Sequence, residues 1–346
     1  MEIAYLLIVI FLFTLATIDL TVGVSNDAVN FLSSAVGSKA AKLKHILLVA
    51  ALGIFIGASF SSGMMDIARH GIFNPDFFYF REVMCIFLAV VISDVFLLDL
   101  FNSLGLPTST TVSMVFELLG ASFIVSLIKI STGNFPVVEG MDGVMPTIAN
   151  LLNSDKALTM IISIFLSVAI AFLFGLIVQW ISRIIFTFHF RKNVGYKIGI
   201  FGGIAVTSIL YFMLIKGLKG SSLVTPEIMQ WINSNTFMLL LGSFAFFTVL
   251  MQLLHWMKIN VFKIIVLIGT FSLAMAFAGN DLVNFIGVTL AGFSSFLDFT
   301  ANAGGLSADQ FVMNSLSESA KTSPLFAQQM AEPIVFQYVI HFLLHA

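Results

Sequence analysis

The sequence predicts an all-α polytopic membrane protein, arranged as an inverted-topology repeat with interrupted helices and re-entrant hairpins. Three observations predict this class. First, 59% of the 346 residues are hydrophobic and only 10% are charged, whereas soluble domains carry about 25% charged residues. Second, apolar runs recur that reach about 20 residues, the length of helix that crosses a bilayer. Third, one short polar motif occurs twice, in segments of opposite predicted orientation.

The apolar runs give the order of the spanning segments. They are too long for transmembrane β-strands and lack the period-two alternation of such strands. The first run has no basic segment before it and no small-residue cleavage site after it, so it is predicted to be a retained span. The polar stretch 301–333 is predicted to be a loop. The spans are expected near residues 4–36, 45–64, 83–101, 111–130, 158–180, 197–216, 236–255 and 263–280, with weaker candidates at 282–297 and 334–346.

Charge gives the predicted orientation. The connections 37–45, 181–197 and 256–263 hold nine of the sixteen Lys and Arg residues and no Asp or Glu. The positive-inside rule places such connections in the cytoplasm. The protein is therefore expected to cross the inner or plasma membrane of the cell several times, in contact with the lipid bilayer, with its amino terminus outside. The net charge of -2 argues against a nucleic-acid partner, and association into a homo-oligomer is left open.

The repeated motif is GVSNDAVN at 23–30 and AGNDLVN at 278–284. The predicted orientation places the two copies, 254 residues apart, in antiparallel helices. Inverted repeats of this kind build secondary transporters whose site lies near the bilayer midplane. Gly23 and Gly279 are expected to interrupt their helices and to expose backbone carbonyl and amide groups. The structural alternative is that the polar side chains only join helices by hydrogen bonds.

The motif offers ligands for ions of either sign. Spacing places Asn26 or Asp27 on the same helical face as Asn30. Oxygens of Asp, Asn and backbone carbonyl groups bind hard cations, and amide groups at the start of a half-helix bind anions. A carboxylate at membrane depth costs about 2.5–3.5 kcal/mol on insertion scales, so Asp27 is expected to have a compensating partner.

The stretch GLPTSTTVS at 105–113 is the second candidate. Gly105 and Pro107 are expected to end one helix, and Ser109, Thr110 and Thr111 to begin the next. Hydroxyl residues at a helix start are ordinary caps. Hydroxyl and amide groups gathered at a helix N-terminus also suit an oxyanion such as phosphate. Both interpretations stay open from this stretch alone.

Five further acids fall within or beside apolar runs, and such residues usually mark an ion pathway or a partner on another helix. They are Asp19, Asp94, Asp99, Glu117 and Asp298, of which Asp99 and Asp298 are expected near a membrane edge and solvated. No Lys or Arg lies at the centre of a predicted span. An anionic substrate would therefore need cations as counter-charge, which favours ion-coupled symport. The sequence has no His/Cys/Asp cluster with metal-ligand spacing and no Walker-type loop, so neither an enzyme, a covalent cofactor nor ATP-driven pumping is expected.

These residues resemble the inorganic phosphate transporter (PiT) family, which are cation-coupled phosphate permeases. GVSNDAVN and AGNDLVN match the family's duplicated GANDVANA-like motif, and GLPTSTTVS matches its proline–Ser/Thr element. The resemblance implies import of inorganic phosphate by symport with sodium, or with a proton; another oxyanion such as sulfate, or a channel or scaffold that does not transport, are the alternatives. It implies a phosphate site of Asn26, Asn30, Ser109, Thr110, Thr111, Asn280 and Asn284, with Asp27 and Asp281 at the coupling cations, to which Glu117 is added as a further acid.

The sequence departs from the family pattern at three places. Val112 stands where the family's usual His follows the Ser-Thr-Thr string. Ile54 stands where a Glu is frequent, although Glu117 in FELLGA offers a comparable acid. A second PTSTT at the same offset would begin beyond Ala346. We therefore expect a piece of a longer permease or a diverged carboxy-terminal part, with a first repeat at 1–150, connecting helices at 151–257 and an incomplete second repeat at 258–346.

Overall fold

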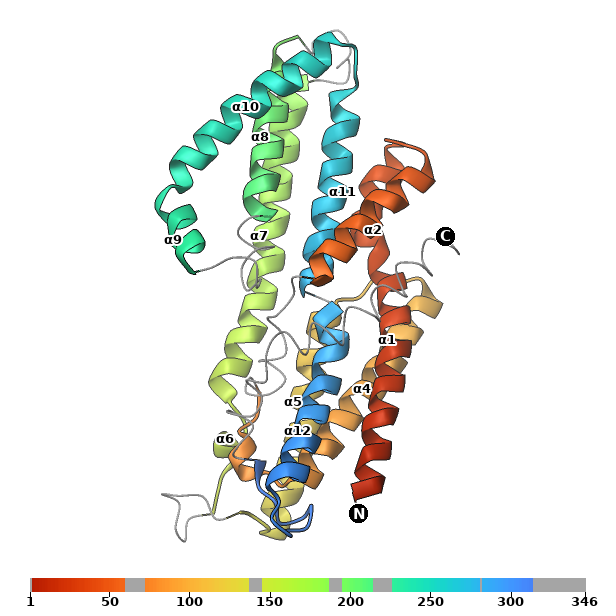
Figure 1. Ribbon diagram of the computed structural model, residues 1–346, viewed down its shortest axis with the longest axis vertical. Coiled ribbons are helices and arrows are strands. Elements are labelled where there is room, and N and C mark those ends of the chain that lie inside the picture. The colour runs from red at the N-terminus through yellow and green to blue at the C-terminus, as the bar shows by residue number, and fades with distance from the viewer. Residues whose placement is uncertain are drawn as a thin grey trace. The chain divides into compact units, whose positions relative to one another are not determined.

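The computed structural model describes residues 2–59, 72–136, 145–186, 195–213, 226–280 and 282–313. Within these ranges the regular elements are helices, with two isolated β-bridges. The helices, shown in Figure 1, are α1 (Glu2–Gly37), α2 (Leu43–Ser59), the 3-10 helix η1 (Pro75–Phe77), α4 (Phe80–Leu104), α5 (Thr110–Thr132), α6 (Ile148–Leu151), α7 (Ser154–Phe186), α8 (Lys197–Phe212), α9 (Pro226–Ser234), α10 (Thr236–Trp256), α11 (Val261–Asn280) and α12 (Leu282–Asn302).

The helices confirm the predicted class of helical membrane protein. Six of those described, namely α1, α4, α5, α7, α10 and α11, are long and apolar enough to cross a membrane, and α2 and α8 are shorter apolar helices. Each of the eight principal predicted spans coincides with a helix, and the weaker candidate at 282–297 coincides with α12. The candidate at 334–346 lies outside the described residues.

The first helix corrects one prediction. α1 is continuous from Glu2 to Gly37, so Gly23 does not interrupt it. Gly23 instead allows close packing, because a Cβ atom at this position would overlap the buried ring of Phe285 on α12. The 36 residues of α1 extend about 54 Å, well beyond a hydrocarbon core of about 30 Å.

At the second motif, α11 ends at Asn280 and α12 begins at Leu282. Asp281 lies outside the described residues, and so do the side chains of Asn280 and Asn284. The inverted repeat, its re-entrant hairpins and the division into repeats at 1–150, 151–257 and 258–346 therefore stay predictions.

Contacts between Cα atoms group the chain into two compact units. The first unit comprises the described parts of 1–29, 62–161 and 280–338, and the second comprises those of 30–61, 162–279 and 339–346. The chain passes from one unit to the other between Val29 and Asn30, and again between Gly279 and Asn280. Both copies of the Asn-Asp motif thus lie where the chain changes unit.

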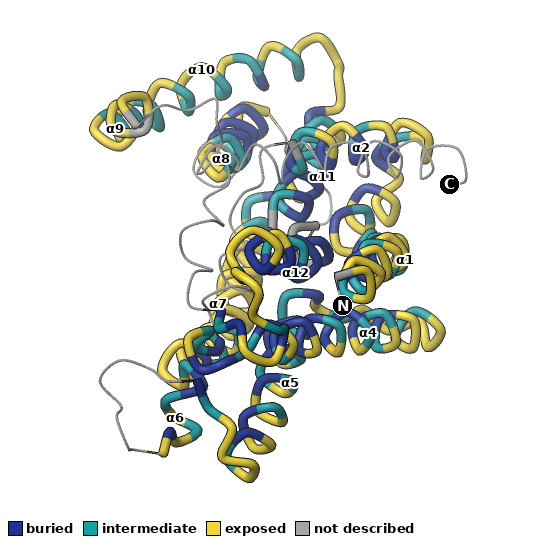
Figure 2. The backbone as a smooth tube through the Cα atoms, turned by 60° about the horizontal axis from the view of Figure 1, so that its bottom comes forward, coloured by how far each residue is buried: buried dark blue, intermediate teal, exposed yellow. Residues whose placement is uncertain are grey.

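The core of the first unit surrounds α4, which packs against α5 and α12. Figure 2 shows buried residues along α12 and along part of α4. The ring of Phe80, the first residue of α4, stacks on Phe299 of α12 with centroids 4.3 Å apart, and Tyr5 of α1 contacts Phe80 at 4.9 Å. Thr289 of α12 also donates a hydrogen bond to the carbonyl oxygen of Leu12 on α1 at 3.4 Å. These contacts hold α1, α4, α5 and α12 together.

One ion pair is buried in this unit. Lys129 Nζ, near the end of α5, lies 2.6 Å from Glu82 Oε2, and the Lys129 side chain is 2% exposed. The ammonium group also lies 4.5 Å from the centroid of the Tyr79 ring. Glu82 in turn accepts the backbone N–H of Tyr79 at 2.8 Å. The pair closes the α4–α5 hairpin at the end opposite its connecting loop.

Replacing one member of this pair is expected to destabilise the protein. Glu82→Gln leaves the buried ammonium of Lys129 without a counter-charge, and such losses cost about 3–5 kcal/mol when both partners are fully buried. Because Glu82 is 21% exposed, we expect a decrease of about 2 kcal/mol in the free energy of unfolding, measured by thermal unfolding in detergent.

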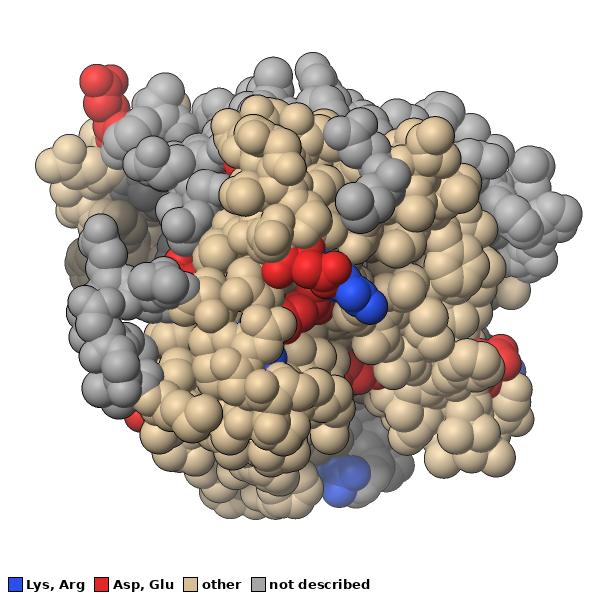
Figure 3. Space-filling view, turned by 90° about the horizontal axis from the view of Figure 1, so that it is seen from below, with Lys and Arg blue, Asp and Glu red and all other residues tan. Residues whose placement is uncertain are grey.

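The matched control is Asp309→Asn. Asp309 pairs with Arg81 at 3.0 Å, but both side chains are about 60% exposed. Figure 3 shows acidic and basic groups side by side on one face of the molecule. Exposed pairs contribute about 0–1 kcal/mol. Equal decreases in melting temperature in the two variants would contradict the expectation that the buried Lys129–Glu82 pair contributes more to stability than the exposed Arg81–Asp309 pair.

In the second unit, helices approach closely at glycines. A Cβ atom at Gly53 of α2 would lie 2.5 Å from the carbonyl oxygen of Phe271 on α11. A Cβ atom at Gly57 would overlap the backbone of Met275. α8 approaches α10 in the same way along 199–203. Small residues spaced four apart let membrane helices approach to backbone contact.

Candidate functional site

The first Asn-Asp motif is joined by hydrogen bonds to the loop that follows α4. Asn26 on α1 is 5% exposed. Its Nδ2 donates to the carbonyl oxygen of Leu106 at 2.9 Å and to Asn102 Oδ1 at 3.0 Å. Its Oδ1 accepts the backbone N–H of Thr108 at 2.9 Å. Asn26 thus holds the loop between α4 and α5 through Leu106 and Thr108, and the end of α4 through Asn102.

Asn102, in the last turn of α4, makes the reciprocal contact. Its Nδ2 donates to the carbonyl oxygen of Val22 on α1 at 2.8 Å, while its Oδ1 accepts from Asn26. We refer to the hydrogen bonds among Asn26, Asn102, Val22, Leu106 and Thr108 as the Asn26–Asn102 network. Sequence analysis missed Asn102; the available signal was an amide in the last turn of an apolar helix, shortly before a helix-ending glycine.

The loop itself turns at Gly105. Its φ of +67° lies in the left-handed region, which favours glycine. The N–H groups of Gly105 and Leu106 return to the carbonyl oxygens of Asn102 and Phe101, at 3.0 and 2.9 Å. This C-cap ends α4, and Pro107 cannot extend it. The local sequence therefore directs the chain back into α5 beside α4.

At the start of α5, one hydroxyl group caps the helix and another has no hydrogen-bond partner among the described residues. Ser109 is the N-cap, and its Oγ accepts the N–H of Val112 at 3.4 Å. Thr110, the next residue, is 1% exposed, and its hydroxyl has no hydrogen-bond partner among the described residues. Thr111 is half-buried. Helix N-termini carry partial positive charge and amide groups without an intrahelical acceptor, so they bind anions readily.

Buried carboxyl groups lie in the same unit. Asp27, directly after Asn26, is 3% exposed. Asp19 on α1 and Asp94 on α4 are 1% and 3% exposed, and Asp94 accepts a hydrogen bond from Ser113 on α5. Glu117 on α5 has a buried Oε2 without a hydrogen-bond partner among the described residues. The expected partner on another helix is thus confirmed for Asp94.

The remaining predicted acids and amides differ in how far they are buried. Asp99 is exposed, as expected. Asp298 is not solvated as expected but only 3% exposed, because its face of α12 packs toward α4; its Oδ1 accepts a hydrogen bond from Asn302 at 2.6 Å. Asn30 is exposed and falls in the second unit. Three further predicted ligands, Asn280, Asp281 and Asn284, lie with their side chains outside the described residues.

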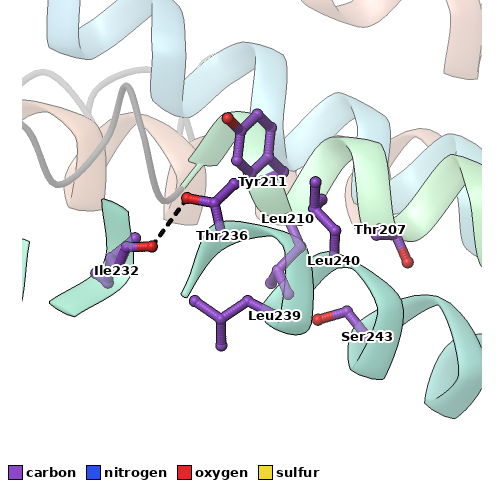
Figure 4. Close-up of a pocket in the computed structure, with 8 residues that line it drawn as sticks. All are labelled: Thr207, Leu210, Tyr211, Ile232, Thr236, Leu239, Leu240 and Ser243. Carbon is purple, nitrogen blue, oxygen red and sulfur yellow. Dashed lines mark hydrogen bonds between the residues drawn. The ribbon is translucent and has the colours of Figure 1, made fainter. Parts of the chain in front are cut away.

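Other places in the described structure are less suited to an ion. Over the described ranges, no three His, Cys, Asp or Glu side chains converge on a position that could hold a metal ion. A hollow between α8, α9 and α10 is shown in Figure 4, where Thr236 Oγ1 donates to the carbonyl oxygen of Ile232 at 2.8 Å. Its space for a water-sized molecule is about 10 Å³, roughly that of one water. An oxyanion does not fit there.

The spans define a multi-pass helical membrane protein. The family model of the phosphate transporter family matches residues 23–337 of this chain. The chain therefore belongs to the phosphate transporter family, and the predicted resemblance is confirmed. The match begins at Gly23, the first residue of the first Asn-Asp motif. No curated protein sequence matches the chain.

The fold is also similar to that of a solved structure described as "The sodium-dependent phosphate transporter". The two superpose with a TM-score of 0.66, over 95% of this chain and 74% of the other, at 18% sequence identity. At this identity the likeness shows the fold, and it agrees with the family found from the sequence.

Proposed function

We propose that the protein imports inorganic phosphate by symport with a cation, in the first place sodium. The observation that carries the proposal is the Asn26–Asn102 network. It fixes the loop before α5 against the motif that contains the buried Asp27, and so brings an anion-binding helix terminus and a carboxylate into one unit. Membership of the phosphate transporter family supports phosphate as the anion.

Phosphate is proposed to bind at the N-terminus of α5. Ser109, Thr110 and Thr111 would contact it with hydroxyl and amide groups, and the buried hydroxyl of Thr110 supports this position because it has no other hydrogen-bond partner among the described residues. Of the motif amides, Asn280 and Asn284 are proposed to complete the site, while a phosphate contact of Asn30, which falls in the second unit, stays a prediction from the sequence. Asn26 donates both amide hydrogens within the protein, so its proposed contribution is to position the loop.

The coupling cation is proposed to balance the charges of phosphate and of the buried acids. Asp27 and Asp281 are its proposed ligands, with Glu117 as a further one. The buried cation described in the first unit, Lys129, is already paired with Glu82 and cannot serve as counter-charge. Sodium is favoured because the similar solved structure is described as sodium-dependent. A proton carried by one of these acids is the alternative to sodium.

The proposed setting is the cell membrane, with the basic connections on the cytoplasmic side and the amino terminus outside. The connections near 37–45 and 256–263 join α1 to α2 and α10 to α11, and their charge supports this orientation. Transport would then proceed inward along the sodium gradient that cells maintain.

Phosphate uptake into vesicles tests the proposal. The purified chain is reconstituted into phospholipid vesicles and given labelled phosphate under an inward sodium gradient, under equal sodium on both sides, or under a proton gradient alone. We expect phosphate to accumulate transiently above its equilibrium level only with the sodium gradient, since coupling lets that gradient drive phosphate against its own gradient. Unlabelled phosphate should compete, and sulfate at equal concentration should not.

Four outcomes would contradict parts of the proposal. Accumulation driven by the proton gradient alone would replace sodium by a proton. Equal entry without any gradient would indicate a channel. Competition by sulfate would change the anion, and absence of uptake by folded protein would support a scaffold.

A further inference from the structure

We propose that Asp19 and Asp94 form a proton-binding site that holds one shared proton between their carboxyl groups. This site is distinct from the proposed phosphate and cation ligands and goes beyond the proposed function. Its ligand is the proton itself, whichever cation accompanies phosphate.

The pair is enclosed by protein. Asp19, on α1, is 1% exposed and Asp94, on α4, is 3% exposed. The contacts of Tyr5 with Phe80 and of Asn26 with Asn102 fix α1 beside α4 in a register that places Asp19 next to Asp94. Two buried carboxyl groups side by side are not both ionised at neutral pH, because each negative charge disfavours the other and burial disfavours both.

The hydrogen bonds around the pair leave a place for this proton. Ser113 on α5 donates its hydroxyl hydrogen to Asp94, and a serine has one such hydrogen to give. Asp19 Oδ1 is buried and finds no donor among the described residues. An unpaired buried acceptor costs about 1–3 kcal/mol. A proton shared with Asp94 is the donor that this side of the pair lacks.

The charged groups around the pair do not supply a competing cation. Those that act on Asp19 are Asp94 and, from α5, Glu117, and both are acidic. On α1, Asp27 lies about 12 Å further along the helix. On α12, Asp298 adjoins Phe299, which stacks on Phe80, about 21 Å from Asp94 along α4.

The ion pair of the first unit is equally distant from the carboxyl pair. Lys129 contacts Glu82 in the first turn of α4, at the same end as Phe80. No described basic side chain can therefore neutralise the Asp19–Asp94 pair directly. With two carboxyl groups and one hydroxyl, and no third acid converging on them among the described residues, the pair suits a proton better than a metal ion.

Infrared spectroscopy of the purified chain in lipid vesicles tests the proposal independently of transport. At neutral pH in sodium-free buffer, the wild-type protein should show the carbonyl stretch of a protonated carboxyl group, shifted by exchange into deuterium oxide. Asp19→Asn and Asp94→Asn should each remove this band, because each deletes one of the two groups that share the proton. Both substitutions keep the side-chain volume, and the amide oxygen of Asn at position 94 can still accept the hydrogen bond from Ser113.

The matched control is Asp99→Asn, which removes an exposed acid from the same helix and should leave the band unchanged. Absence of the band in the wild-type protein would overturn the proposal even if the variants fail to fold. So would a band that survives in either Asp19→Asn or Asp94→Asn. Loss of the wild-type band on adding sodium at constant pH would assign the pair to sodium instead of a proton. Because these readouts need no phosphate, failure of the symport experiment would leave this result unaffected.

Discussion

Asn26→Asp is expected to reduce sodium-driven phosphate uptake about 100-fold, a loss that corresponds to about 2.7 kcal/mol. The change keeps the side-chain shape but removes both amide hydrogens, which now reach Leu106 and Asn102. Each buried acceptor left without its donor costs about 1–3 kcal/mol, and the new carboxylate oxygen would face two oxygens. We expect the loop 105–109 to leave α1 and the start of α5 to lose its position. Initial uptake rate in vesicles is the measurement.

The control for this substitution is Asn233→Asp, the same chemical change at an exposed position on α9. It should leave the uptake rate within about twofold, since surface substitutions usually alter stability by no more than about 0.5 kcal/mol. Hydrogen exchange of the backbone amide of Thr108 provides a second measurement, because its N–H is donated to Asn26. Faster exchange at Thr108 should accompany lost uptake. Near-normal uptake by Asn26→Asp would show that the network does not position the site.

The sequence predicted the spans and the turn between α4 and α5 because their causes are local. A long apolar run can satisfy its backbone in a bilayer only as a helix, and Gly105 with Pro107 ends α4 whatever lies around it. The cap formed by Ser109 is also local. These features required no knowledge of which helices are neighbours in space.

The sequence did not predict features that depend on contacts between distant residues. Gly23 could either break a helix or admit a neighbour, and only the ring of Phe285 on α12 decides between them. Asp19 and Asp94 could each have found a different partner. The role of Asn102 follows from the carbonyl oxygen of Val22, which no sequence pattern identifies as its acceptor.

Gly57→Ala is expected to lower the free energy of unfolding by about 3 kcal/mol, at the upper end of the usual cost of overpacking. The added methyl group would overlap the backbone of Met275 on α11. A helix backbone cannot rotate aside as a side chain can, so α2 and α11 must separate. The segment GIFIGA also contains Ile54, which is buried. Thermal unfolding in detergent measures the loss.

Gly269→Ala on α11 separates this steric effect from helix propensity. A Cβ atom at Gly269 would meet nothing within 4 Å, so the exchange should stabilise the protein by up to about 1 kcal/mol, the propensity difference between Gly and Ala within a helix. The two variants make the same chemical change in helices that pack together, yet opposite shifts in melting temperature are expected. Stabilisation by both would mean that the α2–α11 contact can relax at little cost, and that the glycines of GIFIGA are not required for close packing.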